Sequence, residues 1–262
     1  MGIVNVTPDS FSDGGRYLDP EVAIAHGFEL AAEGADVLDV GGESTRPGAA
    51  AVGVEEELAR VLPVVAALAG AGERVSIDSS KAAVAERALA AGAVIVNDVT
   101  ALGDPAMAAV CADTGAGLVL MHMKGTPRTM QENPTYDDVV VEIRDFLARR
   151  LEAAVAAGVA AERIWVDPGI GFGKTVDHNL ELIERLGELR ELGRPVVLGA
   201  SRKRFLGELT GREVDDRLAA SLSVAVLGVA NGADVLRVHD VAATRDALTV
   251  AAAVRAGDGA LG

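Results

Sequence analysis

Short apolar segments recur along the chain, and each is followed by a polar loop and a longer Ala/Leu/Glu-rich segment with helical spacing. The apolar segments do not alternate with polar residues, which is typical of parallel strands buried on both faces. The pattern predicts strands at Gly2–Val6, Val37–Val40, Val75–Ile77, Val94–Val96, Leu118–Met121, Ile164–Val166, Val196–Leu198 and Val235–Val238. Between them it predicts helices near 20–33, 55–69, 81–91, 105–114, 138–157, 178–190, 215–231 and 241–255.

The segment 215–231 carries the clearest helical pattern. Its apolar residues recur at spacings of three and four, as Leu218 and Leu222 do. We expect Asp215 to be the N-cap, because a short carboxylate accepts hydrogen bonds from the first free backbone N–H groups. Gly232 tolerates a left-handed backbone and should end the helix.

The repeated strand–helix unit predicts an α/β fold, and the length of 262 residues is close to the ~250 of a TIM (β/α)8 barrel. An open, doubly wound sheet would give the same periodicity. Polar groups follow nearly every strand, and a barrel would gather them on one rim. They are Asn5, Asp39, Glu43, Asp78, Asn97, Asp98, His122, Asp167, Ser201, Lys203, Arg237 and His239. We therefore favour the single-domain barrel over the open sheet.

Composition excludes several classes of protein. The chain has 24 basic and 39 acidic residues, a net charge of −15, which argues against general nucleic-acid binding. No apolar run approaches the ~20 residues of a membrane span, and no cationic leader precedes an apolar stretch. The lone cysteine, Cys111, cannot form an internal disulfide, which fits a reducing, cytoplasmic compartment. We expect a soluble protein with small-molecule substrates, no nucleic acid and no membrane.

The loop after the first strand, NVTPDSFSDGG, is rich in short oxygen-bearing side chains, including Asn5 and Asp13. Oxygen ligands suit Mg2+, which often also keeps phosphate oxygens and water in its shell. The same residues also build ordinary turns. Phe11 favours a loop that closes on a ligand, because it is a large apolar side chain in a polar setting.

The second loop, GGESTRPG, contains Arg46 between residues that restrict or free the backbone. Its guanidinium could meet an anionic substrate group. A surface loop with a solvated arginine is the alternative. Asp39, just before this loop, is either a ligand or a buried structural carboxylate.

Asp78, Asn97 and Asp167 stand at the ends of three predicted strands. Carboxylates and amides in a pocket suit a flat ligand with adjacent N–H donors and a carbonyl, such as a pterin or guanine edge. Buried carboxylates need a partner, and Lys203 could be the neighbouring cation. Helix capping is the alternative role, but it is weak for Asp167, which precedes a proline.

The glycine-rich stretch PGIGFGKT is not a phosphate-binding P-loop, because Pro168 occupies the position of the first required glycine. We expect its backbone to approach a planar ligand, with Phe172 in contact. On the last predicted strand, Arg237 and His239 alternate and so share one face. Beside Asn5 of the neighbouring first strand, they would form an anion site where phosphate binds in many barrels.

The motifs together resemble one enzyme family. NVTPDSFSDGG, DVGGESTRPGA, SIDSSK, NDVT, LMHMKGTPRTMQ, DPGIGFGK, GASRKR and RVHD occur in this order. They are similar to those of the dihydropteroate synthases of the folate pathway, from Met1 to about Val254. The resemblance implies a homodimeric TIM barrel that is a sulfonamide target. With Mg2+, it would condense 6-hydroxymethyl-7,8-dihydropterin diphosphate with 4-aminobenzoate, giving 7,8-dihydropteroate and pyrophosphate. Family members usually have a further segment before the first strand.

The resemblance also implies roles for individual residues. The pterin would be held by Asp78, Asn97, Asp167 and Lys203, with Val99 and Met121 as apolar wall. The diphosphate would be held by Asn5, Arg237 and His239, and the Mg2+ by Asn5 and Asp13. The aminobenzoate pocket would be formed by Phe11, Thr45, Arg46, Pro47, Phe172, Ser201 and Lys203. The catalytic set would be Asn5, Asp78, Asp167, Lys203, Arg237 and His239.

The expected chemistry is an SN1-like transfer without a covalent enzyme intermediate. Loss of pyrophosphate leaves a delocalised pterin cation that acidic residues stabilise, and the weakly basic amine then needs position more than activation. Two other functions compete: a pterin-binding paralogue without catalysis, and a pterin-binding barrel that moves a methyl group from a folate to a corrinoid. The first would keep the pterin residues but show a damaged first loop or a lost Arg237/His239 pair, and here both are intact. The second gives no role to that pair or to the GESTRPG loop.

Overall fold

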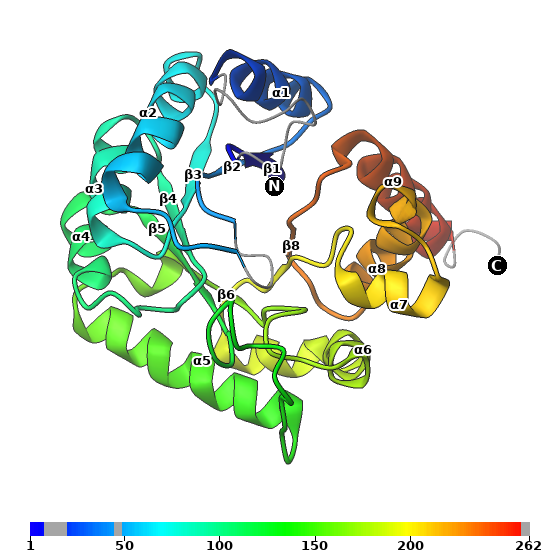
Figure 1. The fold of residues 1–262 in the computed structure, drawn as a ribbon. Coiled ribbons are helices and arrows are strands. Elements are labelled where there is room, and N and C mark those ends of the chain that lie inside the picture. Colours follow the sequence, from blue (N-terminus) through cyan, green and yellow to red (C-terminus); the bar gives the residue numbers. More distant parts are fainter. Residues whose placement is uncertain (8–19, 45–48, 258–262) are drawn as a thin grey trace.

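Within residues 1–7, 20–44 and 49–257, which the computed structural model describes, short parallel strands form a ring with helices outside it (Figure 1). Six strands pair in chain order: β1 (Gly2–Asn5), β2 (Leu38–Gly41), β3 (Val75–Asp78), β4 (Ile95–Asp98), β5 (Gly117–Met121) and β6 (Ile164–Asp167). The strands β7 (Val197–Leu198) and β8 (Val235–Leu236) form a separate parallel pair.

Two isolated parallel bridges close the ring. Val166 of β6 pairs with Val196, which immediately precedes β7, and Gly2 of β1 pairs with Val238 after β8. Backbone hydrogen bonds accompany the second bridge in both directions, from Ile3 N to Val238 O and from Val238 N to Met1 O, each 3.0 Å long. The fold is therefore the closed TIM barrel, and the alternative of an open sheet is wrong.

The outer helices follow the strands in the expected alternation. They are α1 (Pro20–Ala32), α2 (Val54–Gly70), α3 (Ala82–Ala90), α4 (Met107–Thr114), α5 (Val139–Ala156), α6 (Val176–Glu184), α7 (Arg204–Thr210), α8 (Leu218–Ala230) and α9 (Val241–Gly257). Short 3-10 segments lie at Ala161–Arg163 (η2), Leu186–Leu192 (η3) and Val214–Asp216 (η4). None of the described helices is both long and apolar enough to cross a membrane.

The helix boundaries differ from prediction in three places. Asp215 is not the N-cap of α8, because it lies in the 3-10 turn η4 and Arg217 occupies the cap position. The helix predicted over 178–190 ends at Glu184, where Arg185 leaves helical geometry and a 3-10 segment continues. The helix α7 was not predicted. The chain does turn left-handed at Gly232 after α8, as expected, with a φ of 115°.

Strand alternation decides which side chains enter the barrel. One face of the strands packs against the helices in a large apolar core that includes Leu38, Val96 and Leu198. The other face points inward, where a smaller cluster contains Val119 and Val197. Successive strand residues point to opposite faces, so the interior set continues toward the carboxyl ends of the strands. That set reaches Asn5, Asp39, Asp78, Asn97, Met121, Asp167, Gly199 and Arg237.

Candidate active site

A pocket opens at the carboxyl ends of the strands. Its lining comes from β3, β4, β5 and β6 and from the segments that follow β4, β6, β7 and β8. The lining residues are Asp78, Asn97, Val99, Met121, Asp167, Gly169, Phe172, Gly199, Lys203 and Arg237. The structure thus brings together residues that the sequence assigned separately to a flat heterocycle and to an anion.

Strand register accounts for the first half of the pocket. Asp78 pairs with Asn97 across β3 and β4, and with Gly41 across β2 and β3. Gly41 in turn pairs with Asn5 on β1. These residues therefore occupy one level of the barrel, and their inward side chains meet at its mouth. The small Gly41 leaves room beside Asp78, whose Cβ would lie 3.4 Å from a Cβ at Gly41.

Arg237 crosses the pocket floor and pairs with two carboxylates. Its Nε donates to Oδ2 of Asp39 at 2.6 Å, and its Nη2 donates to Oδ2 of Asp78 at 2.8 Å. Asp39 is fully buried, as the alternative of a buried structural carboxylate required. The direct cationic partner of Asp78 is therefore Arg237, whereas Lys203 was the expected one.

The pocket and the residue beneath it combine three carboxylates with two cations. Asp39, Asp78 and Asp167 face two cations, Arg237 and Lys203, so one negative charge is in excess when all five are ionised. Burial raises the pKa of Asp78 to about 7 against the opposing effect of Arg237, and burial also raises the pKa of Asp167. Burial, with repulsion from Arg237, lowers the pKa of Lys203 to about 8.

The turn after β6 holds Asp167 and Phe172 in place. Asp167 Oδ1 accepts a hydrogen bond of 2.6 Å from the backbone N–H of Gly169. Gly169 has a φ of +67°, and a Cβ there would lie 1.9 Å from the carbonyl oxygen of His122, so only glycine fits. Phe172 lies beneath Lys203, whose Nζ is 3.9 Å from the centre of the ring. This contact is a cation–π interaction.

Side chains without a predicted role also support this turn. Lys174 is buried, and its Nζ contacts His122 Nδ1 at 3.0 Å and the carbonyl oxygen of Phe172 at 2.9 Å. Gln131 and Tyr136 donate to the carbonyls of Gly171 and Gly173. In the sequence, the only sign of this role is that Lys174 stands in the glycine-rich stretch PGIGFGKT, which was interpreted only as a possible phosphate-binding loop.

His239 is held by the segment after β7. Its Nδ1 lies 2.9 Å from Ser201 Oγ, and its backbone N–H donates to the same oxygen at 3.2 Å. Beside it, Arg202 and Asp240 form an ion pair with two hydrogen bonds. Burial, with repulsion from Arg237, lowers the pKa of His239 to about 3, so the imidazole is neutral at pH 7. A neutral imidazole supplies no positive charge; it donates a hydrogen bond from one ring nitrogen and accepts at the other.

Asn5 ends β1 at the pocket level and is half-buried. Its amide oxygen is a hard donor of the kind that Mg2+ accepts. No cluster of three His, Cys, Asp or Glu residues that could hold a metal occurs in the described part of the chain. Magnesium would therefore need oxygens from Asp13 or the substrate in addition to Asn5. The other predicted site residues Phe11, Asp13, Thr45, Arg46 and Pro47 lie outside the described residues.

The start of the second loop is anchored by charged side chains, one of which is fully buried. Lys81 Nζ forms ion pairs with Glu43 and, at 2.5 Å, with Glu57 of α2, which is fully buried. Arg60 donates to the carbonyl oxygen of Gly42 at 2.7 Å. These contacts fix the backbone that enters the loop.

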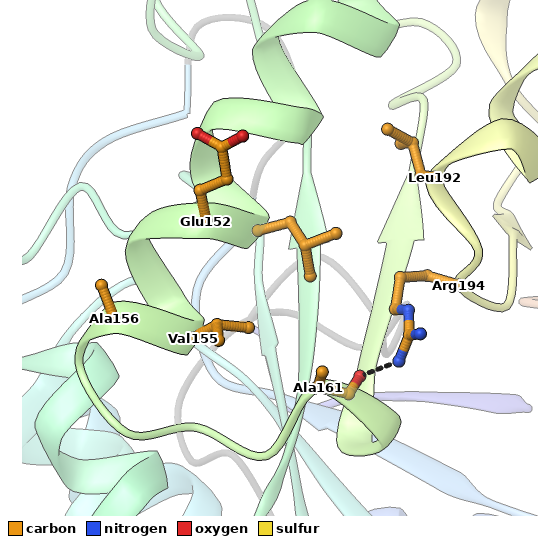
Figure 2. Close-up of a pocket in the computed structure, with 7 residues that line it drawn as sticks. Glu152, Val155, Ala156, Ala161, Leu192 and Arg194 are labelled. Atoms are coloured by element: carbon orange, nitrogen blue, oxygen red, sulfur yellow. Dashed lines mark hydrogen bonds between the residues drawn. The ribbon is translucent and has the colours of Figure 1, made fainter.

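A second hollow lies away from this chemistry. It runs between α5 and the segment around η3 (Figure 2). Its residues are Leu151, Glu152, Val155, Ala156, Ala161, Leu192 and Arg194. Arg194 is tied to the carbonyl oxygen of Ala161, which precedes β6, so this hollow is at the amino ends of the strands. In TIM barrels that face serves stability, and the active site is on the opposite one.

The fold and the pocket define the class of the protein: a TIM-barrel enzyme whose pocket, at the carboxyl ends of the strands, is lined by two carboxylates, an amide and two cationic side chains. Comparisons with known proteins agree. The family model described as pterin binding enzyme matches residues 1–239. The dihydropteroate synthase of Neisseria meningitidis serogroup B is 50% identical over 257 residues, which cover 95% of this chain and 90% of the relative.

Solved structures give the same result. The Xanthomonas albilineans dihydropteroate synthase with 4-aminobenzoic acid has a TM-score of 0.92 and 53% identity, covering 97% of this chain and 92% of that one. The Yersinia pestis dihydropteroate synthase in a sulfonamide drug complex has a TM-score of 0.93 and 44% identity, covering 97% and 93%. The chain therefore belongs to the pterin binding enzymes. Within them it belongs to the dihydropteroate synthases, which are transferases.

Proposed function

We propose that this enzyme condenses 6-hydroxymethyl-7,8-dihydropterin diphosphate with 4-aminobenzoate, giving 7,8-dihydropteroate and pyrophosphate. The observation that carries the proposal is the contact between Arg237 and Asp78 within one pocket. A substrate that combines a flat heterocycle with a diphosphate can then touch the acidic slot and the cation together.

In this proposal the pterin occupies the slot formed by Asp78, Asn97 and Asp167, with Val99 and Met121 as its apolar wall. The carboxylate and amide oxygens accept from the ring N–H groups. Lys203 faces the same slot and supplies a donor for a ring carbonyl. The buried, acidic surroundings of Asp78 and Asp167 stabilise the positive charge that the ring acquires when pyrophosphate leaves.

The departing diphosphate interacts with Arg237, with His239 as a neutral hydrogen-bond donor, and with Asn5. Magnesium held by Asn5 and Asp13 would supply positive charge to the phosphate oxygens. We assign the Ser201 hydroxyl as the donor to His239 Nδ1, and this assignment places the single ring proton on Nε2, which then faces the phosphate as a donor. The carbon–oxygen bond then breaks before the amine attacks, in a dissociative, SN1-like transfer.

The second substrate meets the cation from the outer side of the pocket. We place 4-aminobenzoate against Phe172 and Lys203, with Phe11, Thr45, Arg46 and Pro47 supplied by the first two loops. A sulfonamide drug would compete there, as a sulfanilamide ring has the same outline. The amine needs position more than activation, because the cation is strongly electrophilic.

A coupled assay for pyrophosphate release tests the reaction. Release should require the pterin diphosphate, 4-aminobenzoate and Mg2+ together, and 7,8-dihydropteroate should form in equal amount. Binding of the pterin without any product would instead indicate a paralogue that has lost catalysis. Methyl transfer to a corrinoid, with no pyrophosphate released, would indicate the third function.

We also propose a homodimer through α8 and α9, which pack against each other. Leu227 on α8 is 54% exposed, and Val250 and Val254 on α9 are each 65% exposed. Apolar side chains grouped on adjacent helices favour burial by a second copy. Light scattering should give twice the chain mass, and Leu227→Asp should give the single-chain mass.

We further propose a cytoplasmic enzyme, supported by the buried free thiol of Cys111.

A further inference from the structure

Asp39 lies under the pocket without lining it. Its side chain is fully buried on β2, and one of its oxygens joins two residues that do line the pocket. Oδ2 accepts from Asn97 Nδ2 at 2.9 Å and from Arg237 Nε at 2.6 Å. These partners stand on the pterin side and the diphosphate side of the proposed site.

We propose that Asp39 is a positioning residue that determines which polar atoms Asn97 and Arg237 present to the substrate. The proposal rests on the proposed function, because it assigns these atoms to the pterin and the diphosphate. Asp39 itself touches neither ligand.

The first step concerns the amide of Asn97. An ionised carboxylate only accepts hydrogen bonds, whereas an amide has one accepting end and one donating end. Donation from Nδ2 to Asp39 therefore excludes the flipped amide, which would place Oδ1 against a carboxylate oxygen. The Asn97 oxygen remains available as an acceptor for a ring N–H. Asp39 thus makes this part of the pocket selective for a donor.

The second step concerns the guanidinium of Arg237. Asp39 takes Nε and Asp78 takes Nη2, so two carboxylates bind one edge of the planar group. Two anchored nitrogens fix the plane of a guanidinium, because its donors form a rigid fork. Neither of these two hydrogen bonds uses Nη1. That end of the fork can therefore meet the diphosphate without rotating.

Burial of Asp39 is not evidence that its side chain stabilises the fold. Within the described residues its Oδ1 is buried and has no hydrogen-bond partner. A buried carboxylate oxygen without a partner costs free energy, and buried ion pairs are poor evidence for a gain in stability. Positioning of Asn97 and Arg237 is the benefit that the geometry does show.

The test uses Asp39→Asn, which keeps the shape and removes the charge. Calorimetry measures binding of 6-hydroxymethylpterin, and separately of pyrophosphate with Mg2+, to protein whose fold is verified by circular dichroism. We expect each affinity to fall about tenfold, equivalent to ~1.4 kcal/mol. Ser76→Ala is the matched control, because Ser76 pairs with Asp39 across β2 and β3 and its buried hydroxyl has no partner among the described residues. It should leave both affinities unchanged.

A double-mutant cycle separates positioning from general damage. In an Asn97→Ala background, Asp39→Asn should cost no further pterin affinity, since the amide it orients is gone, but should still weaken pyrophosphate binding. If Asp39→Asn does not fold, Asp39→Ser takes its place in the same cycle. An equal further loss of pterin affinity in both backgrounds would overturn the proposal, as would wild-type affinities for both ligands in folded Asp39→Asn. Failure of the wild type to bind either ligand would instead overturn the proposed function.

Discussion

Arg237 and Asp78 are joined by a hydrogen bond of 2.8 Å between Nη2 and Oδ2, although they are 159 positions apart in the sequence. The barrel creates this contact, because β8 closes next to β1 and both residues point inward. Through it, the arginine proposed to hold the diphosphate neutralises a carboxylate proposed to hold the pterin. The two halves of the substrate therefore bind to electrostatically coupled groups.

Asp78→Asn should separate these two functions. We expect the affinity for 6-hydroxymethylpterin to fall at least about tenfold, because a charged acceptor is lost from the slot. The affinity for pyrophosphate with Mg2+ should stay the same or increase, because a competing anion is removed from Arg237. Calorimetric titrations of each ligand measure both effects. Weaker binding of pyrophosphate in a folded variant would contradict this coupling.

Asp167→Asn and Arg237→Ala should affect different ligands. The first should impair pterin binding, because Asp167 faces the slot and is anchored by Gly169. The second should mainly impair binding of pyrophosphate, and each loss should reach about tenfold or more. Fluorescence titration of the free pterin, beside calorimetry with pyrophosphate, gives the comparison. Equal loss of free-pterin affinity in both variants would count against the division of roles.

Pterin binding should depend on pH on both sides of neutrality. As pH falls through about 7, Asp78 takes up a proton and loses the charge that holds the ring. As pH rises through about 8, Lys203 loses its proton. A bell-shaped profile for 6-hydroxymethylpterin, which carries no titrating phosphate, follows from these two pKa values.

Lys203→Arg provides the check on the alkaline side of that profile. A guanidinium stays protonated across this pH range, so the alkaline decrease should move to higher pH while the acid decrease stays in place. Titrations of both proteins in the same buffers measure the shift. An alkaline decrease at the same pH in both would exclude Lys203 as its origin.

Gly169→Ala should damage the site through the backbone. A methyl group at this position would overlap the carbonyl oxygen of His122, so the turn that holds Asp167 must move. We expect pterin affinity to fall at least about tenfold. Gly193→Ala is the matched control, because Gly193 has a similar φ of +63° and open space around its Cβ. Gly193→Ala should lose stability from backbone strain alone and keep its pterin affinity.

Periodicity and strand-end chemistry predicted the barrel, because buried parallel strands and amphipathic helices leave strong local signals. The predicted N-cap of α8, Asp215, was wrong, because a 3-10 turn precedes the helix. No local sequence rule gives the length of such a turn. Among the site residues, Arg237 was assigned to an anion from its alternation with His239. Its pairing with Asp39 and Asp78 depends on the last strand closing next to the first. Local sequence patterns do not show which distant strands become neighbours.

The support around the glycine-rich turn was harder to predict. Gln131 and Tyr136 come from the loop between β5 and α5, and they meet the stretch that contains Lys174 only in the folded chain. From the sequence alone, each of these residues would be expected to be an ordinary polar residue on the surface. Lys174 becomes buried against His122 only through the tertiary structure. Burial lowers the pKa of both side chains.

Positional isotope exchange tests the central claim that the pocket stabilises a pterin cation beside a retained pyrophosphate. The substrate carries 18O in the oxygen that bridges carbon and phosphorus, and the enzyme is incubated with Mg2+ but without 4-aminobenzoate. If ionisation precedes attack, the label moves into non-bridging positions of the recovered substrate, and Asp167→Asn should slow the exchange at saturating substrate. Label that stays in the bridge, in enzyme that turns over normally when the amine is added, would contradict the account.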